Sequence, residues 1–264
     1  EYLPEGRVRL VCEEESASLI PPVYEAMRRL TPGAISRSDD WWKQVLADPE
    51  YSRRGQSPKF RVVYEADGRP EGYALYRVKD DWDHTGPQNV LNVGEAVTNT
   101  PRALRELWRY LFEVDLVVKV RAGRVSVPMP LQYLLAEPRA LGLVAGDGLW
   151  VRLVDLPAAL AARRFGTADE LVLEVSDDFC PWNAGRWRLR SEGAPGSATA
   201  VIERTEAEPD VLLDTSDLAA IYLGGARPSL LAQVGRIETR TDGVVRRLSA
   251  LFATERTPWC VSMF

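Results

Sequence analysis

Histidine and cysteine are both scarce in this chain of 264 residues. It has one histidine, His84, and three widely spaced cysteines, Cys12, Cys180 and Cys260. An odd number of distant cysteines argues against a disulfide framework and against the closely spaced ligands of a zinc motif. A Ser/His/Asp or Cys/His catalytic system would have to use His84. That histidine lies in a polar segment, and we predict that it is a surface loop residue.

Long apolar runs and an excess of positive charge are also lacking. No run approaches the ~20 apolar residues that cross a bilayer, and the first residues do not resemble a secretory signal, so we expect a cytoplasmic protein without a membrane partner. The formal net charge is -5, which leaves no basic footprint for nucleic acid. The apolar fraction of 45% and the charged fraction of 27% are those of a globular protein with one large or two ordinary domains.

The first half of the chain has the pattern of a mixed α/β unit. Alternating apolar and polar residues predict strands at 7–12, 59–65, 72–79, 89–97 and 117–127, and the AlaAspGlyArgPro segment predicts an antiparallel hairpin. Capping residues and helical periodicity predict four helices: one capped by Ser16 or Ser18, one capped by Ser38, one at 102–112 and a short one at 130–141.

A double tryptophan, Trp41 and Trp42, lies in the helix after Ser38. Two adjacent indoles suit a platform on which a ligand stacks, but they also form one apolar stripe with Val45 and Leu46. Helical spacing with aliphatic neighbours favours a core position over a ligand platform.

The stretch from Asp147 to Arg164 divides the chain. Alternation at 149–154 predicts a strand, and Asp155 is placed to cap a helix with Pro157 in its first turn. Beyond it, strands are predicted at 171–175, 186–190, 199–204 and 211–213, and helices after Thr215 or Ser216, at 229–234 and at 244–252. Strands followed by helices on one face indicate an α+β layer. We predict two domains, residues 1–152 and 153–264.

One cysteine of the second half lies in the short sequence CysProTrpAsn, residues 180–183. A reactive thiol needs a cationic or helix-terminal environment, and no histidine is near Cys180 in the sequence. We favour a structural turn that packs Trp182 over a thiol site.

Several runs resemble one family over almost the whole chain. RSDDWWKQVLADPE, LRELWRYLFEVDL, DGLWVRLVDLPAALAARRF and LVLEVSDDFCPWNAGRWRL are similar to the C-terminal part of the enhanced intracellular survival (Eis) family of N-acetyltransferases. Members of that family carry a GNAT acetyltransferase domain, a second GNAT-like domain and a sterol-carrier-protein-like domain. The resemblance implies the last two: an α+β (mixed α/β) chain with a degenerate GNAT-like domain and a sterol-carrier-protein-like domain. Together with Glu1 in place of a methionine, it favours a fragment.

The resemblance also directs attention to the turn between a strand and a helix that binds the coenzyme in GNAT domains. That turn carries an Arg/Gln-x-x-Gly-x-Gly/Ala loop whose N–H groups meet a pyrophosphate. The corresponding residues here, ValThrAsnThrProArgAla at 97–103, include no glycine and a proline that removes a donor. We expect acetyl-CoA to bind to an absent N-terminal domain and not to this chain. Arg102 and Arg105 suit an anion, but an exposed helix favours solvated charges. No metal ligands are predicted.

The chain ends in ProTrpCysValSerMetPhe. Apolar termini ordinarily fray or pack as filler. The Eis-like enzymes end in an aromatic residue whose α-carboxylate is proposed to act as general base toward the substrate ammonium, and the resemblance gives this role to Phe264. Met263 is predicted to contact the substrate. Apolar neighbours raise the pKa of a carboxyl from its usual ~3.5, which makes it a useful base.

The function implied by the resemblance is acetyl-CoA-dependent N-acetylation of polyamine-like or aminoglycoside-like amines. The full-length protein is expected to be a homo-oligomer, and this fragment alone is expected to be inactive. The alternative is a non-catalytic protein whose sterol-carrier-like half holds a lipid or another apolar ligand. Fold alone does not carry function, and the sequence pattern does not distinguish a tunnel from a filled core.

Overall fold

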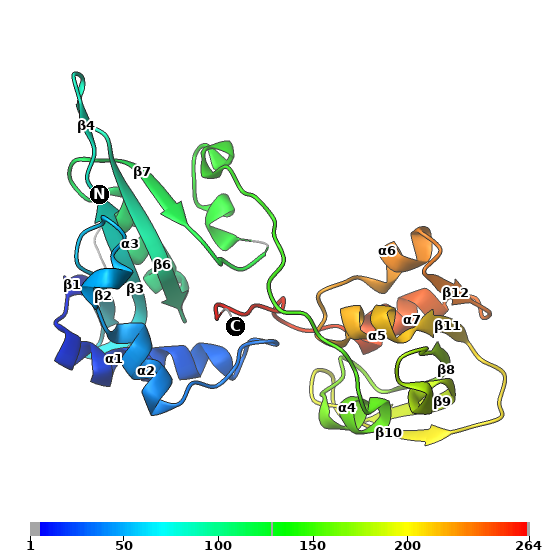
Figure 1. Cartoon of the computed structure of the whole chain (residues 1–264). Helices are drawn as coiled ribbons and strands as arrows, with labels where there is room; N and C mark the ends of the chain where they lie inside the picture. Colours follow the sequence, from blue (N-terminus) through cyan, green and yellow to red (C-terminus); the bar gives the residue numbers. More distant parts are fainter. Residues whose placement is uncertain (1–5, 128, 263–264) are drawn as a thin grey trace. The chain divides into compact units, whose positions relative to one another are not determined.

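The computed structural model describes residues 6–127 and 129–262, and these form two compact units (Figure 1). The first unit contains the described residues up to Gly148 together with those from Trp259 onward. The second unit is Leu149–Pro258. The described residues of the C-terminus, which we assigned to the second domain, therefore make their contacts within the first unit. The division into independently folding domains at 152/153 stays a prediction.

A five-stranded sheet is the centre of the first unit, with strand order β1-β2-β3-β6-β7. The strands are β1 (Arg7–Leu10), β2 (Phe60–Ala66), β3 (Arg69–Lys79), β6 (Asn89–Thr98) and β7 (Val117–Ala122). The first four are antiparallel neighbours, and β7 runs parallel to β6. In the predicted hairpin, Asp67 and Gly68 both have positive φ, as a tight turn between twisted strands requires.

Helices cover both faces of this sheet (Figure 1). One apolar cluster lies between the sheet and α3 (Pro101–Phe112), and another lies between the sheet and the pair α1 (Glu13–Arg28) and α2 (Asp39–Leu46). Ser38 caps α2, as predicted, by accepting a hydrogen bond from the backbone N–H of Trp41. No helix in the part of the chain that the structure describes is long and apolar enough to cross a membrane.

Three local predictions for the first unit are wrong. Helix α1 begins at Glu13 and is capped by the Cys12 thiol, so Ser16 and Ser18 lie inside it. Strand β7 ends at Ala122, five residues early, and the predicted helix at 130–141 is two 3₁₀ turns, η2 (Pro130–Tyr133) and η3 (Pro138–Leu141). Pro138 disfavours the α conformation in the residue before it, which divides the segment.

The remaining short elements of the first unit are η1 (Glu50–Ser52), β4 (Trp82–Asp83) and β5 (Gly86–Pro87). Strands β4 and β5 pair only with each other and hold His84 at their turn. The histidine is exposed, as predicted.

The second unit also has a five-stranded sheet, with order β10-β9-β8-β11-β12. Its strands are β8 (Asp169–Ser176), β9 (Gly185–Glu192), β10 (Thr199–Arg204), β11 (Val211–Asp214) and β12 (Ile237–Thr239). Its helices are α4 (Leu156–Ala162), α5 (Thr215–Tyr222), α6 (Pro228–Gln233) and α7 (Val244–Leu251), with a 3₁₀ turn η4 (Pro181–Asn183). The short β12 was not predicted, and α5 is capped by Asp214 rather than by Thr215 or Ser216.

The segment that we chose as the dividing point is only half as predicted. Asp155 caps α4 by accepting from the N–H of Ala158 at 2.9 Å, and Pro157 lies in the first turn. The predicted strand at 149–154 is wrong, because these residues belong to no sheet. Leu153 is buried while Trp150 is 81% exposed, so the sequence alternates without strand pairing.

Candidate functional site

A β-bulge in β6 decides which face of the first sheet its last residues meet. Val93 packs in the cluster beneath α3, whereas Val97, four residues later, packs in the cluster beneath α1 and α2. The two would share a face in a regular strand, where alternate residues point the same way. The pairing register with β3 skips Gly94, and this extra residue turns Glu95 toward the α1 and α2 side.

Glu95 forms a buried ion pair with Arg37, the residue before the cap of α2. Two hydrogen bonds of 2.9 and 2.7 Å join the guanidinium to the carboxylate, and the two side chains are 2% and 7% exposed. Tyr73 on β3 donates its hydroxyl hydrogen to the same carboxylate. The guanidinium also stacks on Tyr24, 4.1 Å from the ring centroid, and on Trp42, at 4.7 Å.

The surroundings of this pair favour its charged form. Burial lowers the pKa of Arg37, but the hydrogen bonds and the charge of Glu95 outweigh it, and the pKa remains above its usual value. Burial, and then the negative charge of Glu95, raise the pKa of Tyr73 well above 10. Tyr73 therefore stays a neutral donor, and the carboxylate has three strong hydrogen bonds.

Sequence reasoning did not single out Arg37 or Glu95. A signal was present for Glu95: it occupies an inward position of the alternating segment 89–97, where its inward neighbours are mostly apolar. A charge at such a position is rarely buried without a partner. No comparable signal marks Arg37, because its partner is 58 residues away.

The C-terminal segment enters the first unit at Trp259. Its backbone N–H donates to the carbonyl of Pro32 at 2.9 Å, and its indole N–H donates to the carbonyl of Arg124 at 2.8 Å. The strands and hairpin predicted from the sequence do not indicate these contacts, which join the end of the chain to two loops.

Two further residues carry the segment into the interior. Val261 is 2% exposed and belongs to the core cluster beneath α1 and α2. The hydroxyl of Ser262 accepts a hydrogen bond of 3.3 Å from Arg37, so the buried ion pair also contacts the tail. Met263 and Phe264, the predicted substrate-binding and catalytic residues, lie outside the described residues.

A pocket of about 400 Å³ opens beside this tail. It is lined by residues of α2, β3 and β6 and by the two tail residues Val261 and Ser262. Four cations, Arg37, Lys59, Arg77 and Arg124, and one carboxylate, Glu95, contribute to the wall. Two of the cations are paired with carboxylates, Arg37 with Glu95 and Arg77 with Asp48. Trp41 lines it, whereas Trp42 packs in the core as predicted.

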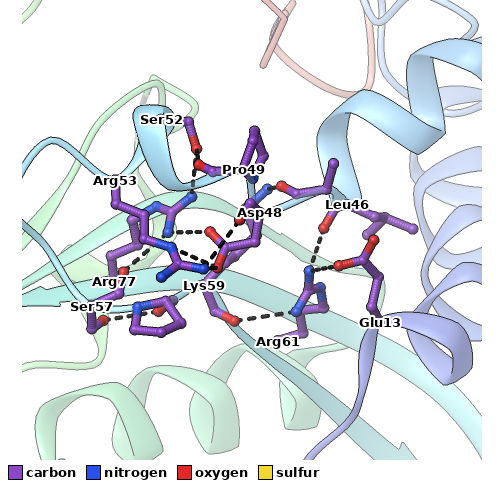
Figure 2. A network of polar contacts seen from close by, with 12 residues as sticks. Glu13, Leu46, Asp48, Pro49, Ser52, Arg53, Ser57, Lys59, Arg61 and Arg77 are labelled. Atoms are coloured by element: carbon purple, nitrogen blue, oxygen red, sulfur yellow. Dashed lines mark hydrogen bonds and ion pairs between the residues drawn. The ribbon is translucent and has the colours of Figure 1, made fainter.

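A polar network at the end of α2 includes two residues that line the pocket, Lys59 and Arg77 (Figure 2). Asp48 pairs with Arg53 and Arg77, and Lys59 donates to the carbonyls of Val45 and Ala47 at 2.6 and 2.5 Å. These two carbonyls are at the C-terminal end of the helix, where a cation is favourable. Lys59 therefore caps α2 from outside the helix.

Lys59, in the wall of the pocket, has a displaced pKa. Burial, and then the positive charges of Arg77 and Arg61, lower the pKa of this amine from 10.5 to about 8. A lysine of this kind is sometimes a nucleophile or base, but its hydrogen bonds to two backbone carbonyls give it a structural role here.

The N-terminus of α3, where a GNAT domain binds its coenzyme, is closed by the chain itself. Thr100 accepts from the N–H of Ala103 and donates to the carboxylate of Glu71 at 2.7 Å. Arg102 makes ion pairs with Glu71 and Asp67, so the prediction that it is a solvated charge is wrong. Thr100 and the Glu71–Arg102 pair therefore occupy the N-terminal end of α3.

The other candidates from the sequence lie apart from this site. Cys12, Cys180 and Cys260 are all free, and Cys180 is buried at the start of the η4 turn. The expected packing of Trp182 in that turn is wrong: its ring is 59% exposed, and its indole donates to the carbonyl of Val154. Asn183 is the buried residue of the turn. Within residues 6–127 and 129–262, no three potential metal ligands cluster.

Two protein family models match the chain, one for each half. The acetyltransferase (GNAT) domain matches residues 33–153, and the sterol carrier protein domain matches residues 156–261. The fold class that we predicted is therefore confirmed: a mixed α/β chain with a GNAT domain followed by a sterol-carrier-type domain.

Several named proteins are similar to this chain. An uncharacterized N-acetyltransferase of Streptomyces avermitilis is 37% identical over 94% of this chain and 58% of its own length. The N-acetyltransferase Eis of Mycobacterium tuberculosis is 34% identical over the same shares. The crystal structure of Eis1 from Mycobacterium abscessus superposes with a TM-score of 0.77 at 28% identity, covering 100% of this chain and 64% of that one. The chain is homologous to the Eis-like N-acetyltransferases and spans about three-fifths of the length of these curated relatives.

The first prediction concerns Lys59. Its amine is expected to titrate near pH 8, which is checked by competitive acetylation with acetic anhydride across pH 6 to 11 and mass spectrometry of the peptides. Arg77→Met removes a nearby positive charge and should raise the midpoint, whereas Arg240→Met in the second unit is the matched control and should not. A midpoint at 10.5 in the unaltered chain would show that the amine is solvated.

The same shift fixes the sign of a stability effect. Because the folded pKa lies below the unfolded value of 10.5, the folded chain binds fewer protons between about pH 8 and 10.5. The contribution of Lys59 to the free energy of unfolding therefore rises with pH across this window and is constant below it.

Proposed function

We propose that this chain is part of an acetyl-CoA-dependent N-acetyltransferase of small amines, with the α-carboxylate of Phe264 as general base. The observation that carries the proposal is the docking of the C-terminal segment: Val261 is buried, and Ser262 contacts the Arg37–Glu95 pair. A terminus that only filled space would need no polar anchors. The N-acetyltransferase names of the homologues support the same reaction class.

In this proposal, the chain's contribution to the reaction is one proton transfer. The Phe264 carboxylate accepts a proton from the substrate ammonium, which frees the nitrogen lone pair for attack. Exclusion of water from this carboxylate would raise its pKa toward the working pH. We propose amines of the polyamine or aminoglycoside kind as substrates and a homo-oligomer as the assembly.

The coenzyme is assigned to a part of the enzyme other than this GNAT domain. Pyrophosphate binding needs free N–H groups and positive potential at a helix N-terminus. Here, Thr100 occupies an N–H of α3, and Glu71 adds a negative charge. We infer that the domain is a scaffold for the C-terminal segment.

A lipid carrier, the other class considered, finds less support. Aromatic and aliphatic side chains fill the interior of the second unit, among them Phe165 and Phe252, whose ring centroids are 5.6 Å apart. Copurified lipid in a native mass spectrum of the chain would favour that class instead.

The second prediction tests the general base in the full-length enzyme. One glycine added after Phe264 moves the carboxylate by up to ~3.8 Å, and deletion of Phe264 displaces it the other way. Because positioned general bases contribute about 10² to 10⁴ in rate, both variants should lose a large part of kcat while melting near the parent temperature. Amidation of the terminal carboxylate is the sharper control, since it keeps the ring in place. A folded, extended enzyme with full kcat between about pH 6 and 9 would exclude Phe264 as the base.

The third prediction concerns acetyl-CoA. Calorimetry on this chain should detect no micromolar binding, because the turn at 97–103 lacks glycines and Glu71 lies at the helix end. Micromolar binding that is abolished by substitutions in the turn would contradict the assignment. Glu71→Gln is the informative variant: loss of the negative charge alone should not create a site, since the donors are still missing.

A further inference from the structure

The last residues that the structure describes, Trp259 to Ser262, are held at three separate places in the first unit. Trp259 is fixed by its backbone and by its indole to the carbonyls of Pro32 and Arg124. Val261 fills a place in the core, and Ser262 ends on the Arg37 guanidinium. The anchors on the first unit belong to loops and strands far apart in its sequence, so the contacts depend on its fold.

These anchors shorten the free part of the chain. Two residues follow Ser262 in the sequence, so an extended backbone anchored at Ser262 can reach at most about 7 Å beyond it. If the segment were released from Trp259 onward, the tether would be six residues long. The effective concentration of a tethered group falls roughly as the -3/2 power of tether length, so threefold lengthening dilutes the carboxylate about fivefold.

Arg37 is suited to holding the C-terminal segment because several contacts fix the position of its own guanidinium. The bidentate bonds to Glu95 and the two aromatic rings fix the guanidinium, while Nη2 is shared between Glu95 and Ser262. A side chain locked in this way positions what it touches more precisely than a loop does. The Gly94 bulge, which turns Glu95 to this face, is therefore part of the same device.

We propose that Trp259–Ser262 and the Arg37–Glu95 pair form a clasp that positions the terminal carboxylate for catalysis. The inference rests on the proposed role of Phe264 and adds positioning residues to it. Arg37 and Glu95 take no part in the chemistry; they limit the volume that the carboxylate samples.

The fourth prediction has a first readout that needs no activity. Amide hydrogen exchange of this chain, followed on its C-terminal peptide, should show protection of the Trp259 amide, which donates to the carbonyl of Pro32. The double variant Trp259→Phe, Ser262→Ala keeps the ring but removes two hydrogen bonds, and it should speed exchange in that peptide while β3 and β6 stay protected. Trp82→Phe, in the exposed β4–β5 hairpin, is the matched control and should change nothing. Full exchange of the tail in the unaltered chain would overturn the clasp.

The second readout uses the full-length enzyme. The double variant should lower kcat by up to about fivefold, the value for complete release, because the Trp259 backbone bond and the buried Val261 remain. KM and the pH midpoint of the rate should stay unchanged, because the base itself is intact. Trp259→Phe with Ser262→Thr, which restores the hydroxyl, should recover part of the loss. If deletion of Phe264 lowers kcat but release of the tail does not, the clasp is overturned alone. If deletion of Phe264 has no effect, the proposed base and the positioning role both fail, whatever the exchange data show.

Discussion

The ion pair between Arg37 and Glu95 is the interaction on which the rest of the first unit's functional face depends. It joins the loop before α2, the strand β6 and the C-terminal segment, three parts of the chain with no local reason to meet. Burying two charges costs several kcal/mol each before their attraction is counted, and the pair persists only if further contacts offset that cost. Tyr73 supplies a third hydrogen bond to the carboxylate, and two aromatic rings flank the guanidinium.

Much of the fold was predictable because its signals are local. The Ser38 and Asp155 caps, the hairpin turn at Asp67 and the exposed His84 all follow from residues within a few positions of one another. Some errors arise where a distant partner decides the outcome. Residues 149–154 alternate like a strand but belong to no sheet. The cap of α1 is a local error, because the Cys12 thiol accepts from the N–H of Glu15, three residues later.

Some residues of the candidate site were likewise predictable from the sequence, and others were not. Phe264 was proposed from the family resemblance, and the homologues bear out that resemblance but not the role of the residue. The sequence did not reveal the clasp residues. Their contacts depend on the bulge in β6 and on a hydrogen bond between residues more than 200 positions apart. Glu95 among apolar inward positions was the one available signal. The sequence pattern likewise did not connect Glu71 to the α3 turn, where it accepts a hydrogen bond from Thr100.

A double-mutant cycle on the free energy of unfolding tests the central claim, that a buried charge pair organises this face. Arg37→Met and Glu95→Met are each expected to cost about 3 to 5 kcal/mol, because each leaves one buried charge without its partner. Chemical denaturation of the four chains should show the double variant to be more stable than either single one, with a coupling of several kcal/mol. Costs that simply add, with the double variant the least stable, would show that the two side chains act independently and would contradict the account.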